Sequence, residues 1–148
     1  MDEFPSAVLF ACTMNSVRSP MAEAILKFLH GTRIYVDSVG VRSREIDGFA
    51  ITVMDEIGID LTQHKAKTFD NLEDSYYDLV IPLSPEAQHR AVEMTRAMAC
   101  RIEFWNIFDP SIFENEDRDS RLNAYRQIRD QLMEKIKAKF PTNPALDI

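Results

Sequence analysis

Hydrophobic and polar positions follow two alternating patterns along the chain. Short apolar or alternating runs predict four strands, at residues 8–11, 33–38, 78–83 and 100–105. Apolar residues at steps of three and four predict four helices, over about 19–30, 49–57, 85–99 and 122–136. Neither period continues through residues 40–48, 59–74 or the tail from Pro141, so we expect loops there.

The ends of these elements carry their own signals. Two Ser-Pro pairs, at residues 19–20 and 84–85, predict helix starts with serine as the N-cap and proline at the first helical position. Gly31 and Gly58 are typical of helix ends, because glycine tolerates the left-handed backbone that closes many helices. Pro82 fits the C-terminal end of its strand better than the middle, since proline cannot donate a hydrogen bond to the sheet.

An alternating order of strands and helices is typical of a parallel sheet with helices on both faces. We therefore expect an α/β fold of three layers, α/β/α, around a four-stranded parallel sheet. The flavodoxin-like pattern favours the strand order 2-1-3-4, with ligands at the carboxyl ends of the strands. The chain has 148 residues, enough to bury a full core, and we expect one domain over residues 1–148.

Composition and charge narrow the classes of protein. The net charge of −7 argues against a nucleic-acid-binding protein, and it means that any anion site is a local positive spot. The sequence has no apolar run of membrane-spanning length, and its acidic N-terminus lacks the features of a signal peptide. We therefore expect a cytoplasmic protein with no membrane partner. The sequence does not set an oligomeric state.

The cysteines and histidines show no pattern of a disulfide or a metal site. Cys12 and Cys100 lie far apart in the sequence. The histidines match no metal-ligand spacing and are expected at the surface; they are His30, His64 and His89. We therefore expect neither a metal nor a cofactor.

One segment combines a strand end, a cysteine and a helix start. The apolar run at 8–11 leads to Cys12, then five residues, then Arg18, directly before the first Ser-Pro pair. The amides of such a loop and the helix dipole favour a bound anion and the thiolate form of a cysteine. The planar guanidinium of Arg18 suits two oxygens of a phosphate. The context favours Cys12 as a nucleophile over a buried, inert cysteine, although the spacing alone is weak.

A second candidate group follows the fourth predicted strand. Asp109-Pro110 would lie on the same sheet edge as the Cys12 loop, where the proline stiffens the turn. A carboxylic acid at this place can protonate a leaving oxygen. The alternative is a plain Asp-Pro turn. Asp117 and Asp119 are weaker candidates for the acid, and we expect them to cap the last helix.

Together these motifs resemble the low-molecular-weight protein tyrosine phosphatase superfamily, which includes the thioredoxin-type arsenate reductases. The resemblance covers nearly the whole chain, and it is carried by residues 7–24, 37–40, 58–60, 64–67 and 109–110. It implies that Cys12 forms a phosphocysteine, that Arg18 binds phosphate, and that Asp109 is general acid and then general base.

The resemblance also implies roles for the loop and its support. The phosphate-binding loop would comprise Thr13, Met14, Asn15, Ser16, Val17 and Ser19. Asn15 and Ser19 would shape the loop and hydrogen-bond the thiolate. Ser38 would support the asparagine.

Two positions inside the loop depart from the family pattern. Met14 stands where the family usually has glycine, so we expect it either to adopt the backbone of the loop or to shift it. Val17 replaces a neighbouring cysteine that many members carry, so no protective disulfide with Cys12 can form.

The expected walls of the pocket depart as well. Ser111 and Ile112 stand where the family has two tyrosines, and the short loop at 40–48 lacks the usual aromatic residue. The short length of this loop is closer to that of the arsenate reductases. Phe49, Phe108 and Phe113 are candidate substitutes, with core packing expected for Phe49.

Three functions fit these features. The first is a cysteine-dependent phosphatase that acts on phosphorylated proteins, on phosphotyrosine by default, with phosphoarginine as an alternative. The second is an arsenate reductase; residues 82–87 hold no relay cysteine and Cys100 begins a strand, so it would need glutathione or glutaredoxin as thiol donor. The third is a non-catalytic phosphoprotein-binding regulator, against which the presence of Cys12, Arg18 and Asp109 together argues. We expect the phosphatase.

Overall fold

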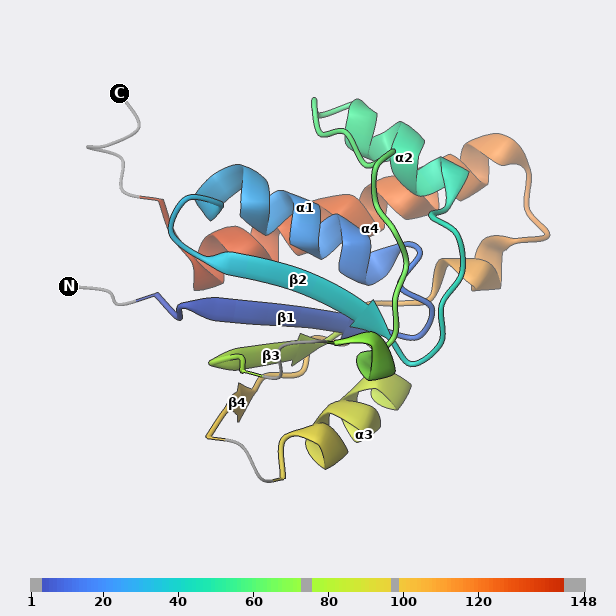
Figure 1. Cartoon of the computed structure of the whole chain (residues 1–148). Coiled ribbons are helices and arrows are strands. Elements are labelled where there is room, and N and C mark those ends of the chain that lie inside the picture. The colour runs from blue at the N-terminus through green and yellow to red at the C-terminus, as the bar shows by residue number, and fades with distance from the viewer. Residues whose placement is uncertain (1–3, 73–75, 97–98, 143–148) are drawn as a thin grey trace.

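The computed structural model describes residues 4–72, 76–96 and 99–142. Strands and helices alternate along the chain (Figure 1). The strands are β1 (Ala7–Cys12), β2 (Tyr35–Gly40), β3 (Leu79–Pro82) and β4 (Arg101–Ile102). The helices are α1 (Arg18–His30), α2 (Gly48–Asp55), α3 (Pro85–Met94) and α4 (Arg118–Lys139), with short 3-10 helices η1 (Phe69–Asn71) and η2 (Pro110–Phe113).

The sheet has the order β2-β1-β3-β4, and each neighbouring pair is parallel. This confirms the predicted 2-1-3-4 order. Helices α1 and α4 cover one face of the sheet and α3 covers the other, which gives the three expected layers (Figure 1). The carboxyl ends of the strands therefore meet at one edge, where β1 leads into α1.

Both faces of the central strand β1 are apolar because both are covered. All six of its residues are buried, and alternate side chains enter different cores. Val8 and Phe10 belong to the larger core, with residues of α1 and α4. Leu9 and Ala11 belong to the smaller core, which includes the buried alanines of α3. An unbroken apolar run is thus the correct signature of this strand.

Strand β4 is shorter than the predicted run at 100–105, and Pro82 is the reason. The amides of Glu103 and Trp105 still donate to the carbonyls of Val80 and Pro82, both at 3.0 Å. The return bond would run from the nitrogen of Pro82 to the carbonyl of Glu103, and proline has no N–H to give. The ladder therefore stops after Ile102, although the chain continues beside β3. Pro82 is the last residue of β3, as predicted.

Helix α3 begins as predicted but ends early. The Ser84 hydroxyl accepts a hydrogen bond from the amide of Ala87 at 3.2 Å, which confirms the serine as N-cap. The predicted end near Ala99 is wrong, because the helix ends at Met94. In the last turn, the hydroxyl of Thr95 donates to the carbonyls of Ala91 and Val92. Such side-chain bonds to the backbone compete with continuation of the helix.

The other helix ends test three further predictions. Ser19 is not the N-cap of α1; that position belongs to Val17, which makes no side-chain cap bond. Gly31 does end α1, but its φ of −61° is not left-handed. Gly58 has a φ of 79°, and Gly58 and Ile59 donate to the carbonyls of Asp55 and Met54 in the pattern of a Schellman motif.

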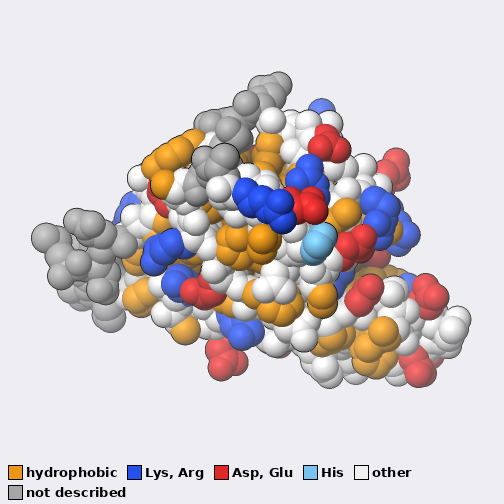
Figure 2. Space-filling view, turned by 90° about the horizontal axis from the view of Figure 1, so that it is seen from below, with side chains coloured by type: hydrophobic (Ala, Val, Ile, Leu, Met, Phe, Trp, Pro, Cys, Tyr) orange, Lys and Arg blue, Asp and Glu red, His pale blue; other side chains and the backbone are white. Residues whose placement is uncertain are grey.

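The surface carries charges of both signs. Figure 2 shows the face that carries α3, where Lys and Arg side chains are interspersed with Asp and Glu. Of the helices that the structure describes, none has both the length and the apolar character needed to cross a membrane. The surface prediction holds for His89, whose side chain is 82% exposed, but it is wrong for His30. His30 is buried, with its Nε2 2.7 Å from the carbonyl oxygen of Phe140.

Candidate active site

The Cys12 loop lies at the carboxyl edge of the sheet. Cys12 is the last residue of β1, and α1 begins at Arg18, so the loop is the connection between strand and helix. Asp109 precedes η2, in the segment that follows β4 along the same edge. The fold thus brings the two ends of the predicted site to one edge, where parallel α/β sheets bind ligands.

The carbonyls of the loop face outward, toward the segment that follows β2. They accept hydrogen bonds of 2.8–3.1 Å from backbone amides in four pairs: Cys12 with Val41, Thr13 with Arg42, Met14 with Arg44, and Ser16 with Asp47. In a trans peptide the carbonyl and the next N–H point in opposite directions. The N–H groups of residues 13, 14, 15 and 17 therefore point inward and form a concave anion-binding nest.

The backbone of the loop turns at Asn15 and not at Met14. Asn15 has a φ of 53°, the one left-handed non-glycine residue in the described part of the chain. Met14 therefore keeps an ordinary φ, so no left-handed glycine is needed at its position. Glycine is needed instead at Gly40, where a Cβ would lie 2.7 Å from the Asn15 nitrogen and 2.8 Å from the Met14 carbonyl carbon.

Two polar groups of Ser19 contact the sulfur of Cys12. The Ser19 hydroxyl lies 2.9 Å from Sγ, and the Ser19 amide donates to it at 3.4 Å. Cys12 is 2% exposed and Ser19 is fully buried, so water does not weaken these contacts. The Ser19 hydroxyl is therefore engaged by Cys12, Asn15 and the Val39 carbonyl, and it does not cap α1.

Arg18 is buried and held at two points. Its Nη1 donates to the carbonyl of Ile107 at 3.1 Å, and its Nη2 donates to Thr13 Oγ1 at 3.4 Å. The Thr13 hydroxyl in turn donates to Ser84 Oγ at 3.1 Å, which links Arg18 to the start of α3. These contacts fix a planar fork of donors beside the nest.

Asn15 joins the loop to a buried polar network. Its Nδ2 donates to Ser19 Oγ at 2.8 Å and to Ser38 Oγ at 3.0 Å. The Ser38 hydroxyl donates to a carboxylate oxygen of Glu23 at 2.5 Å. A chain of hydrogen bonds thus runs from Glu23 on α1, through Ser38 on β2, to the hydroxyl that contacts Cys12.

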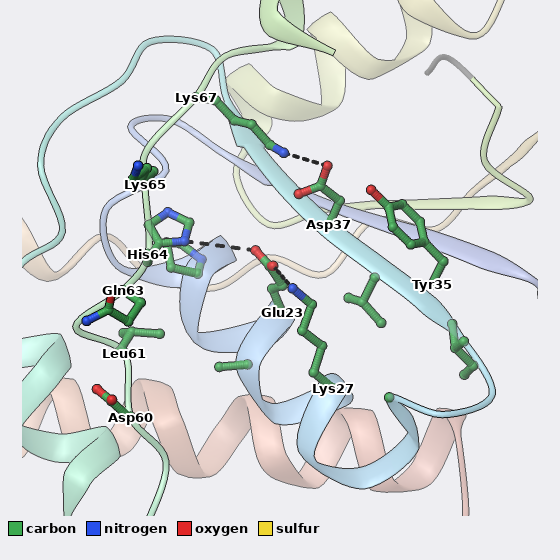
Figure 3. Close-up of a pocket in the computed structure, with 15 residues that line it drawn as sticks. Glu23, Lys27, Tyr35, Asp37, Asp60, Leu61, Gln63, His64, Lys65 and Lys67 are labelled. Carbon is green, nitrogen blue, oxygen red and sulfur yellow. Dashed lines mark hydrogen bonds and ion pairs between the residues drawn. The ribbon is translucent and has the colours of Figure 1, made fainter. Parts of the chain in front are cut away.

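Glu23 and His64 also belong to this network, and sequence reasoning gave neither of them a role. The His64 Nε2 lies 3.0 Å from Asn15 Oδ1 and 3.2 Å from the Asn15 carbonyl oxygen, and its Nδ1 lies 4.0 Å from Glu23. Figure 3 shows both side chains at a second cavity of about 750 Å³ behind the loop, where Lys27 pairs with Glu23 and Lys67 with Asp37. Burial lowers the pKa of His64, and the Glu23 carboxylate offsets this only in part.

Asp109 lines the same cavity as Cys12 and Arg18. This cavity has a volume of about 530 Å³. The Asp109 carboxylate is exposed and accepts a hydrogen bond from the Ser111 amide at 2.9 Å, which orients it at the start of η2. Asp117 instead caps α4 by accepting from the Ser120 amide, as predicted. The described residues contain no group of three metal-ligating side chains.

The comparisons with known proteins agree with this geometry. The family model described as low molecular weight phosphotyrosine protein phosphatase matches residues 7–141. The chain belongs to this family. A glutaredoxin arsenate reductase of Synechocystis is 31% identical over 130 residues, which cover 88% of this chain and 92% of that protein. An arsenate reductase of Halalkalibacterium halodurans is 32% identical over 88% of this chain and 91% of its own.

Solved structures of both activities share the fold. An arsenate reductase in the oxidized state has a TM-score of 0.74 and 28% identity, over 90% of this chain and 95% of its own. The Erwinia amylovora tyrosine phosphatase amsI has a TM-score of 0.72 at 20% identity, over 94% and 95% of the two chains, and this likeness shows the fold alone. The chain is therefore an enzyme of the low-molecular-weight phosphatase superfamily.

The mouth of the cavity is lined by charged side chains of both signs. Besides the loop, Asp109, Pro110 and Ser111, its lining residues are Arg42, Arg44, Asp47, Glu86, Glu114, Arg121 and Tyr125. Phe49 does not line it; its ring packs 5.3 Å from that of Tyr125, which agrees with the expected packing role. Phe108 and Phe113 contact each other edge to face. The cavity therefore has no phenylalanine wall.

Cys100 lies at the wrong edge of the sheet for a relay with Cys12. Arg101, the next residue, pairs with Leu79, which pairs with Val8. Cys100 is thus level with the start of β1, five residues before Cys12, or roughly 16 Å at the rise of a strand. Burial raises the pKa of the Cys100 thiol, which makes it a poorer nucleophile.

Proposed function

We propose that the protein is a cysteine-dependent phosphatase that hydrolyses phosphomonoesters of phosphorylated proteins. One observation carries the proposal: Cys12, Arg18 and Asp109 line a single cavity into which the amides of the loop point. The nest and Arg18 would bind the three equatorial oxygens of the phosphoryl group. Cys12 lies at the base of that nest, as a nucleophile for the phosphorus atom requires.

The reaction would proceed in two displacements. The thiolate of Cys12 attacks phosphorus, the bond to the ester oxygen breaks, and that oxygen takes the proton of Asp109. Asp109, now a carboxylate, removes a proton from water as the water oxygen attacks the phosphocysteine. The S–P bond breaks, inorganic phosphate leaves, and both the thiolate and the Asp109 acid are restored.

The thiols in this chain favour hydrolysis over reduction. Reduction of arsenate to arsenite takes two electrons, which two thiols supply as they join in a disulfide. Position 84, beside the loop, is a serine that contacts Thr13, and Cys100 lies at the opposite edge. Hydrolysis uses only groups that line the cavity, whereas reduction requires a thiol from outside.

Turnover of p-nitrophenyl phosphate and of a phosphotyrosyl peptide tests the proposal. Wild type should hydrolyse both, and Cys12→Ser neither. Asp109→Ala should lose about 100-fold in kcat on the peptide, and less on p-nitrophenyl phosphate, because nitrophenolate leaves without a proton. Asp117→Ala is the matched control, since it removes a helix cap outside the cavity and should keep the wild-type rate. Absence of turnover by wild type on both substrates would refute the phosphatase.

A second candidate function is arsenate reduction with an external thiol. The relatives named arsenate reductase at 31% and 32% identity favour it. The test is arsenate-dependent oxidation of glutathione, with and without glutaredoxin, for wild type and Cys12→Ser. Oxidation that requires both arsenate and Cys12, together with no phosphate release from either ester, would establish the reductase in place of the phosphatase.

A further inference from the structure

We infer that the cavity holds a second anion subsite, formed by Arg44 and Arg121, on the side that residues 41–49 build. The substrate class would then be a phosphorylated protein segment whose neighbouring side chains are acidic or phosphorylated. This inference rests on the proposed phosphatase function and specifies what surrounds the scissile phosphate.

Arg121 is a rigidly held guanidinium in the cavity wall. It lies in the first turns of α4, and its central carbon is 4.4 Å from the centre of the Phe49 ring. Its Nε is buried and has no hydrogen-bond partner in the described residues. With one face on the ring and Nε covered, the terminal nitrogens are the donors that Arg121 can offer to the cavity that it lines.

Asp47 joins this platform to the phosphate loop. The Asp47 amide donates to the carbonyl of Ser16, and its carboxylate accepts from the amide of Phe49 at 2.8 Å. The same carboxylate accepts the hydroxyl of Tyr125 at 2.9 Å, which ties α2 to α4. The position of Arg121 is therefore fixed relative to the nest.

Arg44 reaches the same side of the cavity from the segment that follows β2. Its amide donates to the carbonyl of Met14, while its side chain is exposed and lines the cavity. Neither Arg44 nor Arg121 has a carboxylate within ion-pair distance in the described part of the chain. Arg121 shares a side-chain hydrogen bond with the Tyr125 hydroxyl, but no carboxylate neutralises either cation, so both can pair with an anionic ligand.

No other charged group of the cavity forms an ion pair with Arg44 or Arg121 in the described part of the chain. Arg42 and Glu86 form a two-pronged ion pair at 2.7 and 3.1 Å, so they neutralise each other. Asp47 is engaged as described above. Asp109 and Glu114 flank η2 and line the cavity, and neither forms an ion pair with Arg44 or Arg121 in the described residues. A second anion therefore meets Arg44 and Arg121 without displacing a carboxylate.

A matched set of peptides tests the subsite. Three short phosphotyrosyl peptides would carry glutamine, glutamate or phosphoserine on both sides of the phosphotyrosine. We expect kcat/KM about tenfold higher for the glutamate peptide than for the glutamine peptide, and higher still for phosphoserine, from one or two charge-assisted hydrogen bonds. The phosphoserine arm distinguishes a preference for phosphate from one for carboxylate.

Arg121→Gln and Arg44→Gln should each bring the ratio of kcat/KM for the glutamate peptide to kcat/KM for the glutamine peptide closer to one. Arg118→Gln is the matched control, because it lies on the same helix and does not line the cavity; it should keep the wild-type ratio. Equal kcat/KM on the three peptides would overturn the subsite, as would a ratio that survives both substitutions. Turnover of p-nitrophenyl phosphate distinguishes failure of the subsite from failure of the proposed phosphatase. If wild type does not hydrolyse this ester, the phosphatase itself is refuted.

Discussion

Asn15 has a backbone role and a side-chain role in the loop. Its φ of 53° lies in the left-handed region, which asparagine tolerates better than most residues that carry a Cβ. Its side-chain amide contacts Ser19, Ser38 and His64. One residue therefore sets both the turn of the loop and the place of the hydroxyl that contacts Cys12.

Two substitutions at Asn15 separate these roles. Asn15→Ala removes the amide bonds and places alanine in a left-handed backbone, a strain of about 1–2 kcal/mol. Asn15→Gly removes the same bonds and relieves the strain. We expect both variants to lose kcat on p-nitrophenyl phosphate, and only the alanine variant to show the added loss of stability in urea unfolding. Full activity of Asn15→Gly would mean that the side-chain network does not position the nucleophile.

His64 makes stability depend on pH. Burial lowers its pKa below the ordinary 6.5, so the folded protein takes up this proton at a lower pH than the unfolded chain does. The unfolded state binds more protons in that range, and stability therefore falls as pH drops below 6.5 through the folded pKa. His64→Gln keeps a donor toward Asn15 but does not titrate. Urea unfolding at about pH 7.5 and about pH 5 should show a smaller acid loss in this variant than in wild type; an equal loss would contradict this role.

At the scale of elements, the alternation of strand and helix patterns predicted a parallel sheet with helices on both faces, and the flavodoxin-like pattern supplied the strand order. Local signals also placed the Ser84 cap and the end of β3 at Pro82. Other features depend on partners that are distant in sequence. The length of β4 is set by the missing N–H of Pro82. Ser19 does not cap α1, and its hydroxyl contacts the sulfur of Cys12 instead.

The same limit applies to the supporting residues of the site. Cys12, Arg18 and Asp109 stand out because a strand end, a helix start and an Asp-Pro turn mark them locally. His64 reaches the loop from a polar segment without periodicity, 49 residues beyond Asn15. Glu23 falls on α1 like any solvated helix residue. Both positions fall in segments that carry the family resemblance, but no local signal gives either side chain a role, and the contacts in the folded structure supply that role.

The junction between the loop and the segment after β2 depends on glycine at position 40. Gly40→Ala would place a Cβ against the backbone of Asn15 and Met14, which cannot yield as a flexible side chain does. We expect a loss of about 1–3 kcal/mol in stability and a fall in kcat. Gly48→Ala is the control, because nothing lies within 4 Å of its Cβ, and it should be neutral or slightly stabilising. Equal behaviour of the two variants would show that the close approach is not needed.

At the scale of the whole molecule, the loop separates two cavities. The front cavity of about 530 Å³ holds Cys12 and Arg18, and the back cavity of about 750 Å³ holds Glu23 and His64. The hydrogen bonds of Asn15 and Ser38 connect them through the protein. Among the described residues, no buried side-chain polar atom of Asn15, Ser38, Glu23 or His64 lacks a hydrogen-bond partner, so the loop rests on a satisfied polar network.

At the scale of the whole molecule, the net charge has the same sign as the proposed phosphate-ester substrate. A net charge of −7 repels a phosphate ester at long range, although the nest and Arg18 attract it at short range. Salt screens the long-range field first, since the Debye length is about 8 Å at physiological ionic strength. We therefore expect kcat/KM for p-nitrophenyl phosphate to rise as sodium chloride increases from about 10 to about 150 mM. The value of kcat at saturation should stay constant, because screening acts on encounter and not on the bound complex. A fall in kcat/KM over this range would mean that the local cations of the cavity already dominate the approach of the substrate.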